Sequence, residues 1–418
     1  MNIKILVVVD SIDVNDSSGS KANVALIQNL AAIGLEVKVY HYTRKPIQLS
    51  NIQSVVIKEQ KANVWYLLSK LQLVFTRVTK ININPVIEQL FGFSFTFFND
   101  SNSIRKALEK EKTFQPDWVL TLSKAASFRP HKALLGIPKW HSKWLAYVHD
   151  PYPEHCYPRP YDWVEPGHQI KRKFFLQVNK KATKMVYPSQ YLAEWMESYY
   201  PPGQGKSAII PHQLTNHVTS LESLPEFFNP NHFNILHAGN MMSARNPTSL
   251  ILAFEQFLNK NPEAQEHSKL LFVGVSSDYD KFIKEKQQVL PQLFLSDGYL
   301  EFEKVMLMQK TASVNVIIEA KGFFSPFLPG KFPHCVAADK PILLLGPYYS
   351  EARRLLDDDY PYWSTIDNID KISLIIETLY NKWVKSSIDM KLNRNDLDEY
   401  LSIPYLASFF QILKTLDK

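Results

Sequence analysis

One strand-to-helix unit decides the fold class of this chain: Phe233-Asn234-Ile235-Leu236-His237-Ala238-Gly239-Asn240-Met241-Met242-Ser243-Ala244-Arg245-Asn246-Pro247. An apolar run ends at a glycine, and apolar residues then recur at helical spacing. Asn246 suits a helix N-cap, and Pro247 suits the first helical position. The stretch therefore predicts a buried parallel strand followed by a crossover helix, whose inner face carries Leu250, Ile251, Phe254, Phe257 and Leu258.

Similar units recur along the whole chain, as is typical of parallel sheets with crossover helices. The fold class that this alternation predicts is α/β, in two halves of similar size. We expect strands over Ile3–Val9, Glu36–Tyr42, Gln53–Ile57, Trp118–Leu122, Trp144–Val148 and Met185–Tyr187, and then over Phe233–His237, Leu270–Val275, Val314–Ile318 and Ile342–Leu345.

Turn and breaker residues over 199–205 and 224–230 mark the junction between the halves. We expect an N-terminal domain over 1–205, a linker over 206–232 and a C-terminal domain over 233–397. The amphipathic segment 398–418 is expected to form a helix that returns to the first domain.

Composition places the chain among globular proteins: 45% of its 418 residues are apolar and 21% are charged. A net charge of +6 does not imply nucleic-acid binding, but it favours phosphorylated small molecules or an anionic membrane surface. Two cysteines, Cys156 and Cys335, fit a reducing compartment. The apolar run before Asp10 is shorter than the core of a signal peptide. No segment is long and apolar enough for a transmembrane helix, so we expect a cytoplasmic protein, with the inner face of the membrane as an option.

Open parallel sheets bind ligands at the carboxyl ends of their strands. In the first half, Asn15–Lys21 opens a helix after the first strand, and Gly19 would let a ligand approach unpaired backbone N–H groups. A helix cap without a ligand is the alternative. His149 and Asp150 follow another apolar strand, where a polar pair is hard to explain as core. The alternative there is a turn stabilised by Asp150.

The second half carries the stronger pattern. Gly239 ends a strand, and Arg245 adds a fixed charge close to a helix start, which suits an anion better than it suits an isolated surface arginine. A stiff loop rich in proline and glycine follows the strand that ends at Ile318. Lys331 lies in this loop near a short helix, where it could neutralise a phosphate of the same ligand.

Together these segments resemble family 4 glycosyltransferases, which have the GT-B fold of two Rossmann-like domains facing each other over a cleft. The donor half carries the resemblance in the Leu236–Asn240 and Arg245–Pro247 pieces, and in Ser325–Lys331 followed by Lys340–Gly346. In the first half, Ser18-Gly19, Tyr187-Pro188-Ser189 and Ile210-Pro211 also match.

The resemblance implies transfer of a sugar from a nucleotide-diphosphate donor, usually with retention and without a metal or other cofactor. It implies donor contacts from Gly19, Gly239, Asn240, Arg245, Ser325, Lys331 and His334. Arg245 matches the usual lysine, and Asn240 replaces a common arginine. Pro326 and His334 stand where the family tends to carry two glutamates, and His334 could donate a hydrogen bond to a hydroxyl. His149, with Asp150, would face the transferred sugar as the catalytic pair.

The function we predict is therefore a glycosyltransferase of polysaccharide biosynthesis. Its partners would be a nucleotide sugar and a glycan, lipid-linked or other acceptor, with a peripheral membrane contact as an option and no nucleic acid. Two alternatives remain open: a catalytically silent binding or scaffold protein, suggested by the missing glutamate pair, and a nucleotide-sugar epimerase or hydrolase.

Three further features invite a functional interpretation. Asp357–Asp359 could be mistaken for a metal site, but a solvated helix end explains it better. The stretches 170–184 and 65–80 mix basic and large apolar residues. Each could lie on a membrane surface, although an ordinary amphipathic helix with a solvated basic face is the simpler expectation.

Overall fold

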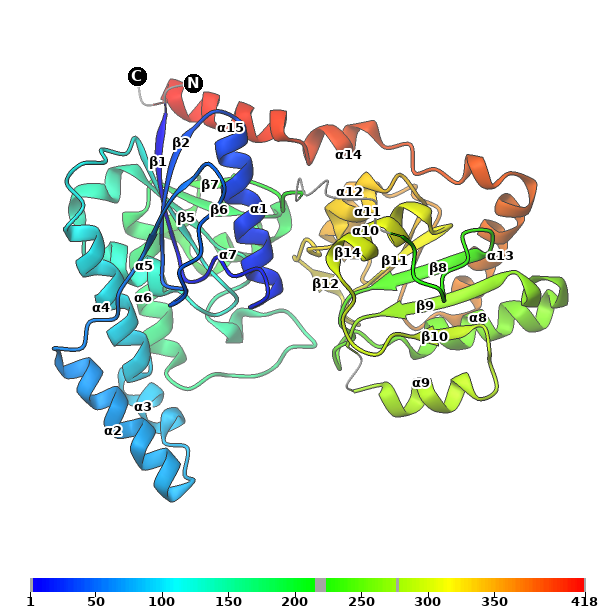
Figure 1. The fold of residues 1–418 in the computed structure, drawn as a ribbon, viewed down its shortest axis with the longest axis horizontal. Coiled ribbons are helices and arrows are strands. Elements are labelled where there is room, and N and C mark those ends of the chain that lie inside the picture. Colours follow the sequence, from blue (N-terminus) through cyan, green and yellow to red (C-terminus); the bar gives the residue numbers. More distant parts are fainter. Residues whose placement is uncertain (1–2, 215–222, 276–277, 417–418) are drawn as a thin grey trace. The chain divides into compact units, whose positions relative to one another are not determined.

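The computed structural model describes residues 3–214, 223–275 and 278–416, which divide into two compact units (Figure 1). The first unit runs to Tyr157, resumes from Tyr161 to Gln213 and takes back the chain from Ser402. The second unit comprises Pro158–Pro160 and the chain from Leu214 to Leu401. Each unit is described by itself below.

The first unit is built on a parallel sheet with the strand order β3-β2-β1-β4-β5-β6-β7. Helices cover both faces of this sheet, so its central strands are apolar on both sides. Leu6 and Val8 of β1 enter one core, whereas Ile5, Val7 and Val9 enter the other. The strands are β1 (Lys4–Val9), β2 (Glu36–His41), β3 (Gln53–Val56), β4 (Trp118–Leu122), β5 (Trp144–Tyr147), β6 (Lys184–Tyr187) and β7 (Ser207–Ile209).

The helices of the first unit include one from the end of the chain. Leu406, Phe410 and Leu413 of α15 are buried in the same core as Val24 and Ile27 of α1, which confirms the predicted return of the C-terminal helix. The helices are α1 (Ser18–Ala32), α2 (Val64–Thr79), α3 (Asn84–Phe91), α4 (Phe95–Glu109), α5 (Arg129–Leu135), α6 (His168–Lys181), α7 (Gln190–Tyr199) and α15 (Ile403–Leu416).

The second unit holds a parallel sheet with the order β10-β9-β8-β11-β13-β15. Its strands are β8 (Phe233–Ala238), β9 (Ser268–Val273), β10 (Leu293–Leu295), β11 (Val314–Ile318), β13 (Ile342–Leu345) and β15 (Trp363–Ser364), and β12 (Phe324–Ser325) pairs with β14 (Tyr349–Ser350) outside it. Its helices are α8 (Thr248–Lys260), α9 (Asp280–Gln287), α10 (Phe302–Thr311), α11 (Phe332–Ala337), α12 (Glu351–Leu356), α13 (Ile369–Lys385) and α14 (Asn395–Tyr400).

The predicted α/β class is confirmed, and every strand expected from the sequence is present with its ends shifted by at most two residues. The structure differs at the junctions. β7 lies inside the expected linker 206–232, part of which falls outside the described residues, and it pairs with β6 as an edge strand. The expected helix 398–418 is divided at Leu401, whose side chain packs with Leu397 in the second unit because the chain changes units there. None of the described helices has the length and apolar composition that a membrane crossing requires.

Candidate functional site

The carboxyl end of β8 is shaped by two glycines. Gly239 has a φ of +144° and Gly274, after β9, has a φ of +136°. A Cβ atom at Gly239 would lie 2.7 Å from Lys331 Nζ, and one at Gly274 would lie 2.7 Å from the carbonyl oxygen of Gly239. Only glycine tolerates both this backbone and this space. Gly239 therefore lets the Lys331 ammonium lie directly against the strand end.

His237 holds that ammonium in place. His237 Nδ1 lies 3.2 Å from the carbonyl oxygen of Val316 in β11, so this nitrogen donates. Lys331 Nζ lies 3.2 Å from Nε2 and 3.4 Å from Nδ1 of His237, and Nε2 is the nitrogen that is left to accept from it. Burial, with a smaller contribution from the charge of Arg245, lowers the pKa of Lys331 to about 7. The Lys331 side chain is therefore held in place, but near neutral pH it is protonated in only part of the molecules.

Arg245 is the second cation at this strand end. Its charge lowers the pKa values of both His237 and Lys331, after burial. Among the described residues, no carboxylate forms an ion pair with Arg245 or Lys331, although the charge of Arg245 acts on the buried carboxyl group of Glu319. Two neighbouring cations that form no ion pair with a carboxylate repel each other, so an anion bound between them would stabilise both.

The helix that follows Arg245 begins later than the sequence predicts. α8 starts at Thr248, with Pro247 as its N-cap, whereas we expected Asn246 at the N-cap and Pro247 inside the helix. Asn246 Oδ1 still accepts a hydrogen bond from the backbone N–H of Thr248, over 2.8 Å. Asn246 therefore caps the first turn of α8 although it lies one residue before the N-cap, Pro247.

Glu319, directly after β11, is a functional candidate that the sequence analysis missed. Its side chain is buried, and Ser325 Oγ donates to its Oε1 over 2.7 Å. Burial raises the pKa of Glu319 to about 7, although Ser325 and the charge of Arg245 act in the opposite direction. A carboxyl group near Arg245 can thus take up or release a proton near neutral pH. An acidic residue directly after a strand in which only Asn315 is polar was the available signal.

The other predicted donor residues already have partners within the second unit. Asn240 Nδ2 donates to the hydroxyl of Tyr299 over 2.8 Å, and Ser325 is committed to Glu319. His334 lies edge-on to Phe302, with ring centroids 5.2 Å apart, and burial lowers its pKa to about 4. The structure therefore joins Gly239, Arg245 and Lys331, while Asn240 and Ser325 brace the surrounding loops.

In the first unit, the predicted approach at Gly19 is filled by another side chain. Gly19 lies in α1, whose N-cap Ser17 accepts from the backbone N–H of Ser20 over 3.1 Å. A Cβ at Gly19 would lie 3.2 Å from Lys124 Cγ. Lys124 pairs with Asp16 at 2.6 Å. Gly19 therefore makes room for Lys124, and this helix start is capped by the protein itself.

His149 is buried, and its hydrogen bonds define its tautomer. Asn23 Nδ2 donates to the carbonyl oxygen of Ser123, so Asn23 Oδ1 is an acceptor. His149 Nε2 then donates to Asn23 Oδ1 over 2.7 Å, which leaves Nδ1 as an acceptor. Burial, with His212 stacked nearby, holds the pKa of His149 well below its usual value. Asp150 is half-buried, and its charge helps to raise the pKa of Glu154, which burial raises most.

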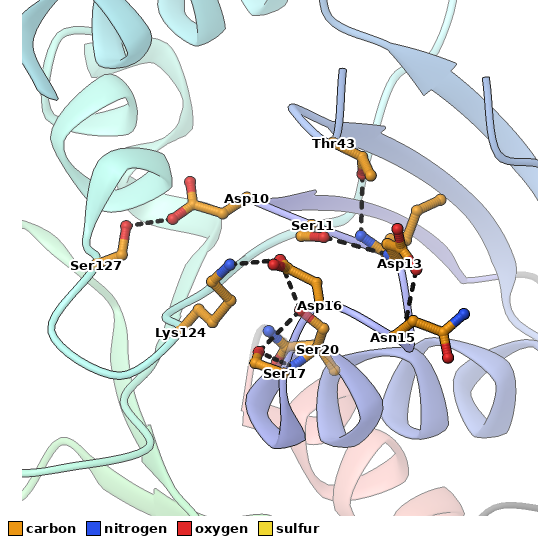
Figure 2. A network of polar contacts seen from close by, with 12 residues as sticks. Asp10, Ser11, Asp13, Asn15, Asp16, Ser17, Ser20, Thr43, Lys124 and Ser127 are labelled. Carbon is orange, nitrogen blue, oxygen red and sulfur yellow. Dashed lines mark hydrogen bonds and ion pairs between the residues drawn. The ribbon is translucent and has the colours of Figure 1, made fainter. Parts of the chain in front are cut away.

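A polar pocket of about 370 Å³ lies at the carboxyl ends of β1, β2 and β4 in the first unit (Figure 2). The sequence analysis did not predict it. Four carboxylates and four cations line it together with hydroxyl groups: Asp10, Ser11, Asp13, Asp16, Tyr42, Thr43, Arg44, Lys45, Thr96, Asp100, Lys124 and Arg129. The charges that line it are therefore balanced.

Each cation of this pocket is paired. Figure 2 shows Lys124 directed at Asp16 and the Asp10 carboxylate bonded to Ser127. The remaining ion pairs are Lys45–Asp13 at 2.5 Å, Arg44–Asp100 at 2.9 Å and Arg129–Asp100 at 3.0 Å. These ion pairs hold many hydrogen-bond donors and acceptors in fixed positions, and such an arrangement suits a neutral ligand with many hydroxyl groups. No group of three or more potential metal-binding side chains was found within the described residues.

Solved structures show the same fold over the full length of the chain. The Anabaena protein HepE, in complex with UDP and glucose, has a TM-score of 0.57 and 12% identity, with 100% of both chains covered. The trehalose-6-phosphate synthase OtsA has a TM-score of 0.60 and 11% identity, with 99% of both chains covered. WaaG, a glycosyltransferase involved in lipopolysaccharide biosynthesis, has a TM-score of 0.54 and 10% identity, with 96% of this chain and 99% of WaaG covered. No family model matches the sequence, and no curated protein sequence matches it.

These likenesses define the class of fold. Each unit of this chain is Rossmann-like, and the chain has the GT-B fold of the glycosyltransferases, as the sequence resemblance predicted. The similar structures include a trehalose-phosphate synthase as well as a lipopolysaccharide glycosyltransferase, so the likeness extends to the fold and not to one family.

Proposed function

We propose that this protein is a glycosyltransferase that transfers a sugar from a nucleoside-diphosphate sugar to a hydroxyl group of an acceptor. The observation that carries this proposal is the pair Arg245 and Lys331, two cations at one strand end with no carboxylate partner in the described part of the chain. A diphosphate supplies the missing negative charge. HepE, which has the same fold, was solved with UDP and glucose bound.

The second unit would be the donor domain. Arg245 can hold two phosphate oxygens at once through its planar guanidinium group. Lys331, supported by His237, adds a point charge against the strand end. As the sugar leaves, negative charge grows on the diphosphate, and fixed cations stabilise that charge. These two residues would then make a metal ion unnecessary for the leaving group.

The first unit would be the acceptor domain. Its charge-balanced pocket offers hydroxyl-binding groups without a net charge. His149 would contribute as a neutral hydrogen-bond acceptor through Nδ1, because Nε2 is committed to Asn23. In a retaining transfer, such a group orients the sugar and need not act as a base. Asp150 and, in the donor domain, His334 remain candidates for contacts to sugar or ribose hydroxyls.

Turnover of the donor tests the proposal. The purified protein is incubated with a panel of nucleotide sugars, with and without glycan and lipid-linked acceptors, in excess chelator and again with Mg²⁺ or Mn²⁺. We expect acceptor-dependent release of nucleoside diphosphate in chelator. Binding of nucleotide sugars without any turnover would support the silent binding protein instead. Acceptor-independent release or an epimerised donor would support the hydrolase or epimerase.

A further inference from the structure

Helices α2 and α3 form a hairpin that extends away from the sheet of the first unit (Figure 1). We call residues 64–91 the α2–α3 hairpin. Isolated exposed apolar residues are common on protein surfaces, but a contiguous set marks an interaction site. The exposed apolar side chains of this hairpin are Val64, Leu67, Leu71, Leu73, Val74, Phe75, Val78, Ile81, Val86, Leu90 and Phe91.

In α2 the buried side chains are polar and most of the apolar side chains are exposed, the reverse of an ordinary surface helix. Its buried residues are Ser69 and Gln72, and Gln72 donates to Asn84 of α3. Residues 64, 67, 71, 74 and 78 recur at spacings of three and four, so they form one stripe along the helix. Their exposed fractions lie between 57% and 75%. The apolar face of the helix is therefore exposed, while the polar side chains on the opposite face form hydrogen bonds within the protein.

Contacts at the base fix this orientation. Trp65 stacks on Phe98 of α4 with ring centroids 4.7 Å apart. Asn63, the N-cap of α2, donates through Nδ2 to Asn99 Oδ1 over 2.9 Å. The outward direction of the apolar stripe is thus set by packing and hydrogen bonds on the opposite face.

The charge of the segment identifies the partner. The α2–α3 hairpin carries Lys70, Arg77 and Lys80, and Lys61 lies just before it. Its one acidic residue, Glu88, pairs with Lys171 of α6 at 2.9 Å. All four basic residues are exposed. Helical spacing places Lys70 and Arg77 beside the apolar stripe. A helix with an apolar face flanked by basic residues binds the interface of anionic membranes, because apolar side chains enter the acyl boundary while the bases contact lipid phosphates.

We infer that the α2–α3 hairpin docks the protein on the surface of an anionic phospholipid membrane, lying in the interface without crossing it. At 16 and 8 residues, α2 and α3 are too short to span a bilayer. This inference does not depend on the proposed glycosyl transfer.

Vesicle sedimentation of the full chain tests the inference. Vesicles of pure phosphatidylcholine are compared with vesicles that also contain phosphatidylglycerol. We expect binding to the anionic vesicles that weakens with salt. The triple variant Leu67→Ser, Leu71→Ser and Val78→Ser should lower the partition coefficient by about tenfold or more, since each lost apolar contact weakens insertion. The variant Lys70→Glu, Arg77→Glu and Lys80→Glu should lose the preference for anionic lipid.

A matched control removes three exposed apolar residues elsewhere: Leu374→Ser, Val384→Ser and Ile388→Ser in the second unit. This control should bind vesicles like the parent. The inference is overturned if the parent ignores anionic vesicles, or if the hairpin and control variants bind them equally. It is also overturned if the parent does not bind vesicles but forms a dimer that the hairpin variant abolishes, because the face would then belong to a second copy.

Discussion

The two units treat the cations at the carboxyl ends of their strands in opposite ways. In the pocket of the first unit, every lysine and arginine pairs with a carboxylate. At the strand end of the second unit, Arg245 and Lys331 have no such partner within the part of the chain described. Under the proposed function, this difference means that two similar Rossmann-like sheets present a site for an anion in one unit and a site for neutral hydroxyl groups in the other.

The largest effect is expected at His149. Replacing it with alanine should lower kcat and kcat/KM together by about a hundredfold, with little change in donor affinity, if its contacts strengthen as charge develops on the sugar. Steady-state kinetics on a variant with the parent's melting temperature measures this. His141→Ala, another histidine of the first unit, is the control. A near-normal kcat would leave His149 as a structural residue that orients Asn23.

The strand end of the second unit predicts a large effect from a small change. Gly239→Ala would place a Cβ 2.7 Å from Lys331 Nζ at a φ of +144°. The ammonium must move, so nucleoside-diphosphate affinity should fall by about tenfold or more. Gly298→Ala, at a φ of +77° with open space around it, is the control for replacing a positive-φ glycine without a contact to Lys331. If both variants bound nucleoside diphosphate with the same affinity, Lys331 would not contact the ligand.

The pKa of Lys331 predicts a pH dependence. It is about 7 in the free protein, and a bound diphosphate should raise it because an anion favours the charged form. Binding then takes up protons, so affinity should fall by about three- to tenfold as pH rises from 6.5 to 8.5. Calorimetry in buffers of different ionisation enthalpy measures the uptake. Lys331→Arg should flatten the profile, and an unchanged profile in that variant would assign the titration to another group.

The smallest expected effect is on stability at Glu319. Its pKa is about 7 in the folded chain and 4.5 ordinarily, so the folded state holds the proton more tightly. The free energy of unfolding should therefore fall as pH rises from 4.5 to 7 and remain lower above it. Glu319→Gln removes this loss and should raise Tm at pH 8 by about 5 °C, with little change at pH 4.5. A lower Tm at pH 8 would show that the ionised carboxylate is needed in the fold.

The sequence predicted the central strands because continuous apolar runs are unambiguous when both faces of a sheet are covered. It missed β7, β10, β12, β14 and β15, whose two or three residues carry too little pattern. The proximity of Arg245 and Lys331 was predictable, since each follows a strand and β8 lies beside β11 in the sheet.

Features made by distant segments could not be predicted in the same way. The pocket of the first unit combines Arg44, Asp100 and Arg129, which come from separate elements and carry no local signature. The interpretation of Gly19 changed for the same reason, because Lys124 reaches it from the end of β4. The apolar and basic composition of 65–80 was visible in the sequence, but the outward direction of its apolar face required the packing of Trp65 and Gln72.

Calorimetric titration with UDP, GDP and ADP tests the central claim most directly. Parent, Arg245→Ala and Lys331→Ala proteins are compared with Lys321→Ala, an exposed lysine of the same unit that pairs with Asp367. Charge-assisted hydrogen bonds contribute about 1.5–3 kcal/mol, so each site variant should bind the preferred nucleotide about ten- to a hundredfold more weakly, while the control binds like the parent. Unchanged affinity in both site variants, with unaltered melting temperatures, would contradict the assignment of these two cations to a diphosphate.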